Sequence, residues 1–402
     1  MLGHLKSLRT NENILVAVDT LLHSKSVFVS VFLMTYMIRT SLTDSPDGFI
    51  IFRLVSYIVM GAASIFLMRF LRKHPLAAWR IGTFSSILKI GLVILLDPYS
   101  ITFPLIIALI NGLEATLYWR PTVFFSITEV RNDRRHRFES LKHIFSSIVR
   151  IISPIILALL ITDAGFAQTS IVIIIISIVQ FFITILFRPA RVVTTRPHKL
   201  RAIWNQFIRI KDLRRNILLM QFVRGLLISG SAYLLVPIIL IYTYSQSDIA
   251  LGIYTSIGVI FAITLTFTYQ RIARSPKRIR SFAKLIAPFA ILAPLLLVLS
   301  PSTPFAVIFY IFSIAAVEGF FNLFASVHIM NSIKKHLNGD SYLLEVECVG
   351  EVALCVGRVI SFSTLLILIT LTGTTYLPHF AVISSLAIIP ALTITLPKHS
   401  KS

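Results

Sequence analysis

Charged residues are scarce in this sequence of 402 residues: 14% are Asp, Glu, Lys or Arg, whereas 56% are hydrophobic. A typical soluble domain carries about 25% charged residues. Acids are the rarer charged type, with 17 Asp and Glu against 38 Lys and Arg and a formal net charge of +21. This composition excludes a soluble globular protein and indicates a membrane protein.

Cysteine is nearly absent as well, since the chain holds only Cys348 and Cys355. On one predicted helix their spacing separates them by about 10 Å along the axis, too far for a disulfide. The sequence also lacks a Walker loop, an HExxH motif, a CxxC motif and a combination of residues that could form a hydrolase triad. We therefore expect neither an ATP-driven pump nor an enzyme, and we expect no metal or other cofactor.

Long apolar runs dominate the sequence instead. Windows of about 20 apolar residues, the length that crosses a membrane as a helix, recur throughout the chain. Turn residues such as Ser45-Pro46-Asp47-Gly48 separate them. The pattern predicts an all-α membrane protein with twelve transmembrane helices. Their expected ranges are 14–38, 49–71, 77–96, 101–124, 141–163, 169–187, 216–241, 249–270, 282–299, 305–329, 348–371 and 380–396.

Basic residues alternate between the predicted loops. The N-terminus, the even-numbered loops and the C-terminus hold most of the Lys and Arg, whereas the odd-numbered loops hold Arg39 and isolated acids. Cytoplasmic loops of membrane proteins carry an excess of Lys and Arg, so both termini should lie in the cytoplasm of a multi-pass plasma-membrane protein. The positive charge then indicates contact with anionic lipids of the inner leaflet rather than with nucleic acid.

The longest predicted loop, residues 188–215, is basic and lies near the midpoint of the chain. We expect it to link an N-terminal six-helix half, residues 1–187, to a C-terminal six-helix half, residues 216–402. Trp204 and Phe207 beside its bases suggest an amphipathic helix on the inner leaflet. Orientation and lipid contact would explain this loop, and a regulatory or partner site is the alternative.

A repeated charge pattern relates the two halves. Arg150-Ile-Ile-Ser follows Glu139, and Arg358-Val-Ile-Ser follows Glu347 at the same spacing. That spacing is close to three helical turns, so each acid and its base share one helix face, roughly 16 Å apart. The repeat indicates two copies of one membrane half, an organisation typical of transporters.

Several ionisable residues lie within the predicted helices, with more bases than acids. A charge at the bilayer centre costs at least about 3 kcal/mol, so such groups normally face a cavity or a partner. The excess of cations favours an anionic or amphipathic solute, including a lipid-linked one. These residues are Asp19, Lys25, Arg53, Lys89, Glu114, Arg120, Arg150, Arg224, Glu318, Glu351 and Arg358.

Some of these charges could simply reach the headgroups. Arg53 begins the second predicted helix, and Arg120 and Arg224 lie near the inner ends of the fourth and seventh. A long basic side chain in such a place can extend to the membrane surface. Snorkelling is therefore one interpretation of these three arginines, and a cavity charge is the other.

The deeper acids and bases allow two interpretations. Glu114 with Arg150, and Glu318 with Arg358, could form buried ion pairs that hold helices together, although such pairs are weak evidence for stability. Alternatively, these residues could couple transport to protons or contact the substrate. Glu351 precedes Arg358 by two helical turns and could pair with it or with a basic loop.

Twelve helices, two similar halves and a basic central loop resemble the major facilitator superfamily over the whole chain. The Gly-x-x-x-x-x-Tyr-Trp run from Gly112 to Trp119 and the Gly-Arg-Val-Ile-Ser run from Gly357 to Ser361 resemble an uncharacterised group of that superfamily in Gram-positive bacteria. The resemblance implies that the first, fourth, seventh and tenth helices line a central cavity. It therefore places five ionisable residues near the transport path: Asp19, Lys25, Glu114, Arg224 and Glu318.

Two departures from the superfamily pattern are visible. The loop between its second and third helices usually carries Gly-x-x-x-Asp-Arg-x-Gly-Arg, but here the segment from Phe66 to His74 has bases and no Asp. The acid of the superfamily's gating charge relay is therefore missing from this loop. The Gly-Pro of antiporter fifth helices appears as Ser153-Pro154.

The sequence thus predicts a secondary active transporter that works by alternating access. We expect a monomer that binds a small-molecule or amphipathic substrate, with protons as a coupling ion. A non-transporting membrane scaffold or sensor on the same fold is the alternative, favoured by the altered gating loop. The candidate substrate or coupling residues are Asp19, Lys25, Glu114, Arg150, Arg224, Glu318 and Arg358.

Overall fold

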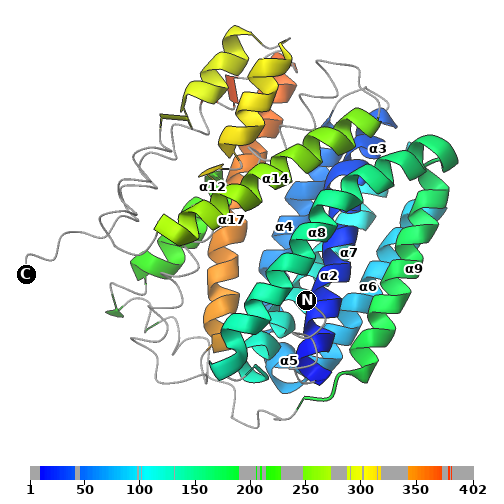
Figure 1. Ribbon diagram of the computed structural model, residues 1–402, viewed down its shortest axis with the longest axis vertical. Helices are drawn as coiled ribbons and strands as arrows, with labels where there is room; N and C mark the ends of the chain where they lie inside the picture. The colour runs from blue at the N-terminus through cyan, green and yellow to red at the C-terminus, as the bar shows by residue number, and fades with distance from the viewer. Residues whose placement is uncertain are drawn as a thin grey trace, which may run out of the picture. The chain divides into compact units, whose positions relative to one another are not determined.

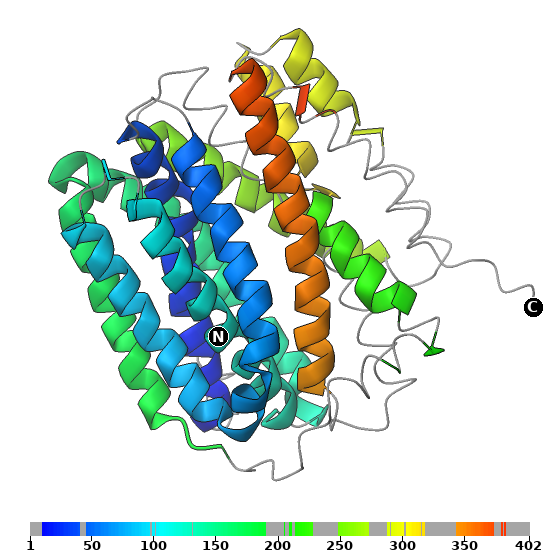
Figure 2. The same cartoon turned by 180° about the vertical axis from the view of Figure 1, so that it is seen from behind.

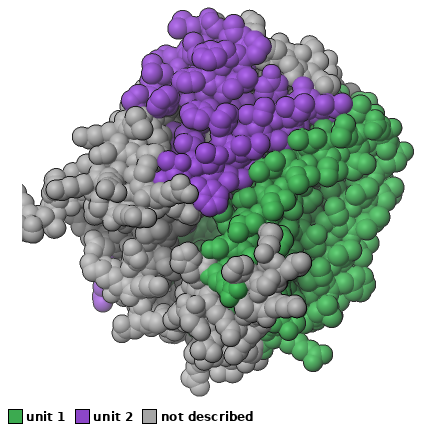
Figure 3. Space-filling model, viewed as in Figure 1, with its two compact units in different colours: residues 1–205, 338–352 green, residues 206–337, 353–402 purple. Residues whose placement is uncertain are grey.

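The structure is a computed structural model that divides into two compact units (Figure 3). The first comprises Met1–Asn205 with Asn338–Val352, and the second comprises Gln206–Leu337 with Ala353–Ser402. The residues that the structure describes are 10–40, 46–96, 99–100, 102–130, 132–189, 205, 209–210, 214–227, 248–272, 288–289, 291–300, 303–314, 316–317, 343–373, 379–380 and 382.

The first unit is a bundle of long helices (Figure 1). Within it α7 packs on α4 and α6, α9 packs on α6 and α2, and α2 also packs on α8. A π-helical turn continues α2 directly into α3, so these three elements form one apolar span. The bounds are α2 Thr10–Val27, the π-helical turn Phe28–Phe32, α3 Leu33–Arg39, α4 Asp47–Phe66, α5 Met68–Lys73, α6 Pro75–Leu95, α7 Thr102–Thr128, α8 Asn132–Ala164 and α9 Phe166–Leu186.

The described part of the second unit is also helical. A π-helical segment, Arg214–Leu219, leads into α12, Met220–Leu227, and α14 spans Asp248–Ile272. Helix α17, Leu343–Thr372, begins in the first unit and continues in the second, and it is seen along its length in Figure 2. The predicted helix at 380–396 falls almost entirely outside the described residues, as do most of the linker at 188–215 and parts of the predicted helices at 216–241, 282–299 and 305–329.

Eight helices among the described residues are long and apolar enough to cross a membrane. They correspond to predicted helices one to six, eight and eleven, which are thereby confirmed. Two shorter apolar helices, Ile217–Leu226 and Pro304–Ile314, fall in predicted helices seven and ten. The described residues contain no strand, so the prediction of an all-α multi-pass membrane protein is confirmed.

Two predicted boundaries are corrected. Helix α8 starts at Asn132 rather than near 141, because the charged run before the apolar segment contains good helix formers and no Gly or Pro. The second predicted helix, 49–71, is divided at Leu67 into α4 and α5. Both α8 and α17 are continuous, so each repeated acid and its downstream arginine do lie on one helix.

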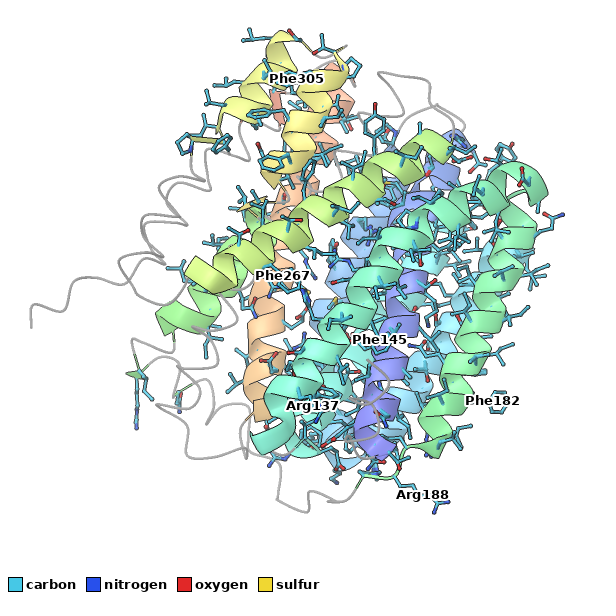
Figure 4. The ribbon with its side chains drawn as sticks, viewed as in Figure 1. Arg137, Phe145, Phe182, Arg188, Phe267 and Phe305 are labelled. Atoms are coloured by element: carbon cyan, nitrogen blue, oxygen red, sulfur yellow. The ribbon has the colours of Figure 1, made fainter. Side chains whose placement is uncertain are left out.

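Apolar side chains are exposed on the outer surfaces of the helices. Phe182 on α9, Phe267 on α14 and Phe305 on the helix Pro304–Ile314 are all exposed (Figure 4). Isoleucine and leucine side chains share this outward position on α8 and α9. An apolar exterior around long helices is what contact with lipid tails requires.

An aromatic core of the first unit lies where α6, α7 and the end of α9 meet. The Trp79 ring lies 5.6 Å from that of Phe125 and 5.2 Å from that of Phe187, centroid to centroid. Leu344 and Cys348 of α17 belong to the same buried cluster. The first turns of α17 are therefore packed into the first unit, which positions the carboxylates that they carry.

Gly112, the first residue of the Gly-to-Trp119 run, marks a close helix crossing. A Cβ atom at this position would lie 2.6 Å from the carbonyl oxygen of Ser56 and 2.8 Å from the side chain of Val59. Only glycine permits α4 and α7 to approach so closely. This contact brings the polar residues in the middle of the two helices within hydrogen-bonding distance.

Candidate functional site

A buried ion pair joins α6 to α7 in the first unit. The ammonium nitrogen of Lys89 lies 2.5 Å from Oε2 of Glu114, and these side chains are only 5% and 10% exposed. Lys89 also donates a hydrogen bond to Oδ1 of Asn111 at 3.0 Å. The structure thus gives Glu114 a different partner from Arg150, which the sequence had suggested for a structural ion pair.

Further hydrogen bonds extend this cluster to α4 and α2. Asn111 donates to Oγ of Ser56 at 3.3 Å, and Lys25 of α2 donates to Oγ of Ser86 at 2.8 Å. Lys25 is buried, and the charges of Glu114 and Lys89 act on its ammonium group. We call Lys25, Ser86, Lys89, Asn111 and Glu114 the central polar cluster; it contains two bases and a single acid.

A second group of charges links α2 to α8. Asp19 is buried and lies 3.4 Å from Nε2 of His23 and 3.4 Å from the ammonium nitrogen of Lys142. The neighbouring carbonyl of Val18 accepts a hydrogen bond from Nε2 of Gln180 at 2.8 Å. Asp19 is therefore held between one imidazole and one ammonium group, at a place separate from the Lys89–Glu114 pair.

Arg150 lies on α8 and is half-buried, and its charge acts on His143, which lies two turns earlier on the same helix face. Ser153, one turn later, donates a hydrogen bond to Oγ of Ser24 on α2 at 3.4 Å. Arg150 thus belongs to the α2–α8 interface. Neither Asp19 nor Glu114 forms an ion pair with it.

The first turns of α17 carry three carboxylates that meet arginines of the first unit. Arg72 of α5 forms an ion pair with Glu345, and both side chains are buried. Arg120 of α7 lies 2.9 Å from Oε2 of Glu347 and also pairs with Glu351. We call these two arginines and three glutamates the α17 clasp.

The α17 clasp excludes the snorkelling interpretation of Arg120 and adds a partner for Glu351. Arg120 is only 7% exposed and is held by two carboxylates, so it does not extend to the membrane surface. The sequence allowed Glu351 to pair with Arg358 or with a basic loop, and the structure shows Arg120 as a partner of Glu351. The segment from Phe66 to His74, which lacks an Asp, meets a carboxylate of α17 instead, since its Arg72 pairs with Glu345.

The structure brings some predicted site residues together and separates others. Lys25 and Glu114 share the central polar cluster, whereas Asp19 and Arg150 belong to the α2–α8 interface. Arg224 and Arg358 lie in the second unit, on α12 and α17. Glu318 lies outside the described residues.

Sequence reasoning did not identify Ser86, Asn111, His23 and Lys142 as partners of these charges. Uncharged polar residues are common in membrane helices, so Ser86 and Asn111 give no signal until helix neighbours are known. His23 could have been found, because it follows Asp19 by four residues and therefore shares its helix face.

No protein-family model matches this chain, and no curated protein sequence matches it either. Several solved structures do match it along almost the whole length. A bacterial homologue of the iron transporter ferroportin, in an outward-facing state, has a TM-score of 0.65 and 13% identity, covering 96% of this chain and 98% of its own. A bacterial ferroportin homologue in an inward-facing state has a TM-score of 0.66 and 14% identity, covering 97% and 98%.

Two other solved transporters are similar to the same extent. The nucleoside transporter NupG has a TM-score of 0.67 and 12% identity, covering 96% of this chain and 99% of its own. A POT family transporter in complex with 5-aminolevulinic acid has a TM-score of 0.64 and 15% identity, covering 95% and 96%. Similarity at these identities concerns the fold, and the chain has the major-facilitator-like fold that the sequence predicted.

Proposed function

We propose that this chain is a secondary active transporter that moves a small solute across the cytoplasmic membrane by alternating access. The likeness in fold to transporters over nearly the whole chain is the observation that carries this proposal. The repeat of two membrane halves and the lack of a Walker loop agree with it. The ferroportin homologue has been captured in both outward-facing and inward-facing states, as such a mechanism requires of a carrier.

We propose further that both termini are cytoplasmic and that the two six-helix halves are residues 1–187 and 216–402, joined by the linker at 188–215. In this orientation the α17 clasp lies at the cytoplasmic end of the membrane. Opening at that end would have to separate Arg72 from Glu345 and Arg120 from Glu351. The α17 clasp would therefore favour the state that is closed to the cytoplasm.

The clasp proposal predicts unequal effects of its two Arg120 partners. Glu351 is 5% exposed and Glu347 is 22% exposed, so water can replace the second interaction more easily than the first. Glu351→Gln should speed hydrogen exchange of the backbone amides at the start of α17 at least about tenfold, which is about 1.4 kcal/mol. Glu347→Gln is the matched control and should have a smaller effect; equal exchange in both variants would contradict the clasp.

We propose Asp19, Lys25, Glu114, Arg150, Arg224, Glu318 and Arg358 as the residues that contact substrate or coupling ion. For proton coupling, Glu114 and Glu318 are the candidate acids. Protonation of Glu114 would leave Lys89 and Lys25 buried without their shared carboxylate. Because uncompensated buried charges are costly, protonation of Glu114 would be linked to a rearrangement of α6 and α7.

Proton coupling through Glu114 is tested with the double variant Lys89→Met/Glu114→Gln, which removes the acid together with its ion-pair partner Lys89. Compounds that stabilise the purified protein in a thermal-shift screen of anionic metabolites, lipid precursors and cationic drugs serve as solutes for liposome uptake. Wild type should concentrate the solute in response to a pH gradient, and the double variant should only equilibrate it. Gradient-driven uptake by the double variant would contradict coupling through Glu114, and a scaffold or sensor would give no uptake by wild type.

A further inference from the structure

Two glycines bring α12 and α17 into direct backbone contact within the second unit. A Cβ atom on Gly225 would overlap the carbonyl oxygen of Leu354, and one on Gly357 would overlap the carbonyl oxygen of Phe222. Figure 2 shows the end of α12 meeting α17 near the middle of its length. The two helices therefore cross at these glycines with no side chain between them.

The contacts at this crossing are equivalent on both sides. The carbonyl that Gly225 meets belongs to the residue three positions before Gly357. Gly225 also lies against the backbone nitrogen of Arg358, one residue after Gly357. Gly357 in turn lies against the backbone nitrogen of Leu226, one residue after Gly225. Helix α12 falls in predicted helix seven and α17 in predicted helix eleven. Both are odd-numbered, so in the proposed topology the two helices cross the membrane in the same direction.

An arginine flanks each glycine, and the crossing geometry places both arginines on one side. Arg224 immediately precedes Gly225, and Arg358 immediately follows Gly357. Successive residues of a helix are rotated by about 100° about its axis. Arg224 is therefore rotated in one direction from Gly225, and Arg358 is rotated in the other direction from Gly357. Because the helices face each other and run in the same direction, opposite senses bring Arg224 and Arg358 to the same side of the crossing.

Two buried polar side chains lie one turn beyond the arginines on this side. Gln221 precedes Arg224 by three residues and Ser361 follows Arg358 by three, so each shares the face of its arginine. Gln221 is 7% exposed and Ser361 is 4% exposed. The side-chain oxygen of Gln221 is buried and has no hydrogen-bond partner within the described parts of the chain. A buried acceptor without a donor is costly, and a ligand would supply that donor.

We propose that Arg224 and Arg358 form an oxyanion-binding site in the second unit, with Gln221 and Ser361 as its neutral hydrogen-bonding groups. The inference rests on the proposed transport function and gives its substrate class: a solute with a phosphate or carboxylate group and a nearby hydroxyl or amine. Guanidinium groups bind such oxyanions through paired N–H donors. The free oxygen of Gln221 accepts a hydrogen bond from the hydroxyl or amine.

The test measures binding to the purified full chain in detergent by calorimetry and by thermal shift. The probes are inorganic phosphate, glycerol phosphate and malate, each compared with sodium chloride at equal ionic strength. Wild type should bind at least one oxyanion saturably. Arg224→Gln and Arg358→Gln should each weaken that binding at least tenfold, and Arg358→Lys should weaken it less. Gln221→Leu should weaken the hydroxyl-bearing probes more than inorganic phosphate.

Arg53→Gln provides the matched control, because it removes an equally charged membrane arginine whose guanidinium lies over the Phe49 ring in the first unit. This control should bind the oxyanion as wild type does. The inference is overturned if no oxyanion acts differently from chloride, or if Arg53→Gln weakens binding as much as Arg358→Gln. It is also overturned if Glu318→Gln restores the stability lost in Arg358→Gln, since Arg358 would then be a structural ion-pair partner.

Transport is tested separately, by one distance measured at the cytoplasmic end of the protein and another measured at its outer end. If one distance lengthens when the other shortens but no oxyanion binds, only the anion site is refuted. Oxyanion binding without alternating distances would leave the site in place and refute the transport function.

Discussion

Lys89→Met should destabilise the protein by about 3 to 5 kcal/mol, because it leaves the Glu114 carboxylate buried without its ammonium partner. The double variant Lys89→Met/Glu114→Gln should recover most of this loss, since it leaves neither member of the Lys89–Glu114 pair without its partner. The measurement is the free energy of unfolding in mixed micelles for wild type, both single variants and the double variant.

The two single losses and the double loss form a cycle that isolates the coupling between the side chains. Replacement of exposed Arg69 on α5 by Gln is a control for loss of charge alone, and it should change stability by less than about 0.5 kcal/mol. A Lys89→Met loss as small as that of the control would contradict the buried ion pair. A double variant as unstable as the sum of the singles would show that the two side chains act independently.

Gly357→Ala should destabilise the second unit by about 3 kcal/mol, since the added methyl group meets backbone atoms of α12 and the helices have to separate. The nearest amide nitrogen, that of Leu226, lies 2.7 Å from the position of the new Cβ atom. Backbone atoms, unlike a flexible side chain, cannot move aside locally. Thermal unfolding of the purified protein measures the effect.

Gly91 on α6 offers a matched control, because a Cβ atom there meets nothing within 4 Å. Gly91→Ala should leave stability unchanged or raise it by up to about 1 kcal/mol through helix propensity. Equal effects of Gly357→Ala and Gly91→Ala would mean that α12 and α17 do not cross through their glycines. The anion site would then lose its geometric basis as well.

The fold was predictable because each helix carries its own signal. The run Phe166–Leu186 is apolar at nearly every position, and a helix is the structure that satisfies its backbone in lipid. The start of α8 was harder to predict. Its first turns are charged, and only tertiary packing or the lack of breakers extends a helix beyond the apolar run.

The partners of the buried charges were not predictable in the same way. The sequence identified Lys89, Glu114, Arg120 and Glu351 as unusual, because any charge in an apolar helix is unusual. It could not choose between Arg150 and Lys89 for Glu114, since the choice depends on which faces of α6, α7 and α8 meet. Close contacts at glycines fix which helix faces meet, and those contacts can be seen only in the folded structure.

Gly357 is another residue whose structural role could not be predicted from the sequence. The Gly-Arg-Val-Ile-Ser run was visible as a motif that resembles other sequences, but its physical role was not. The structure gives the role of Gly357 as the crossing with Gly225. In the proposed anion site, this crossing is what places Arg224 and Arg358 on the same side of the two helices.

The most direct test of alternating access uses pairs of spin labels in liposomes. One pair, Arg69→Cys with Leu219→Cys, reports the predicted cytoplasmic end, and another, Tyr99→Cys with Thr303→Cys, reports the predicted outer end. Both native cysteines are buried and are replaced by alanine. A carrier should show two distance populations at each end, and conditions that lengthen one pair should shorten the other. A single unchanged distance at both ends, across pH values and with every stabilising compound, would contradict the account and indicate a static scaffold.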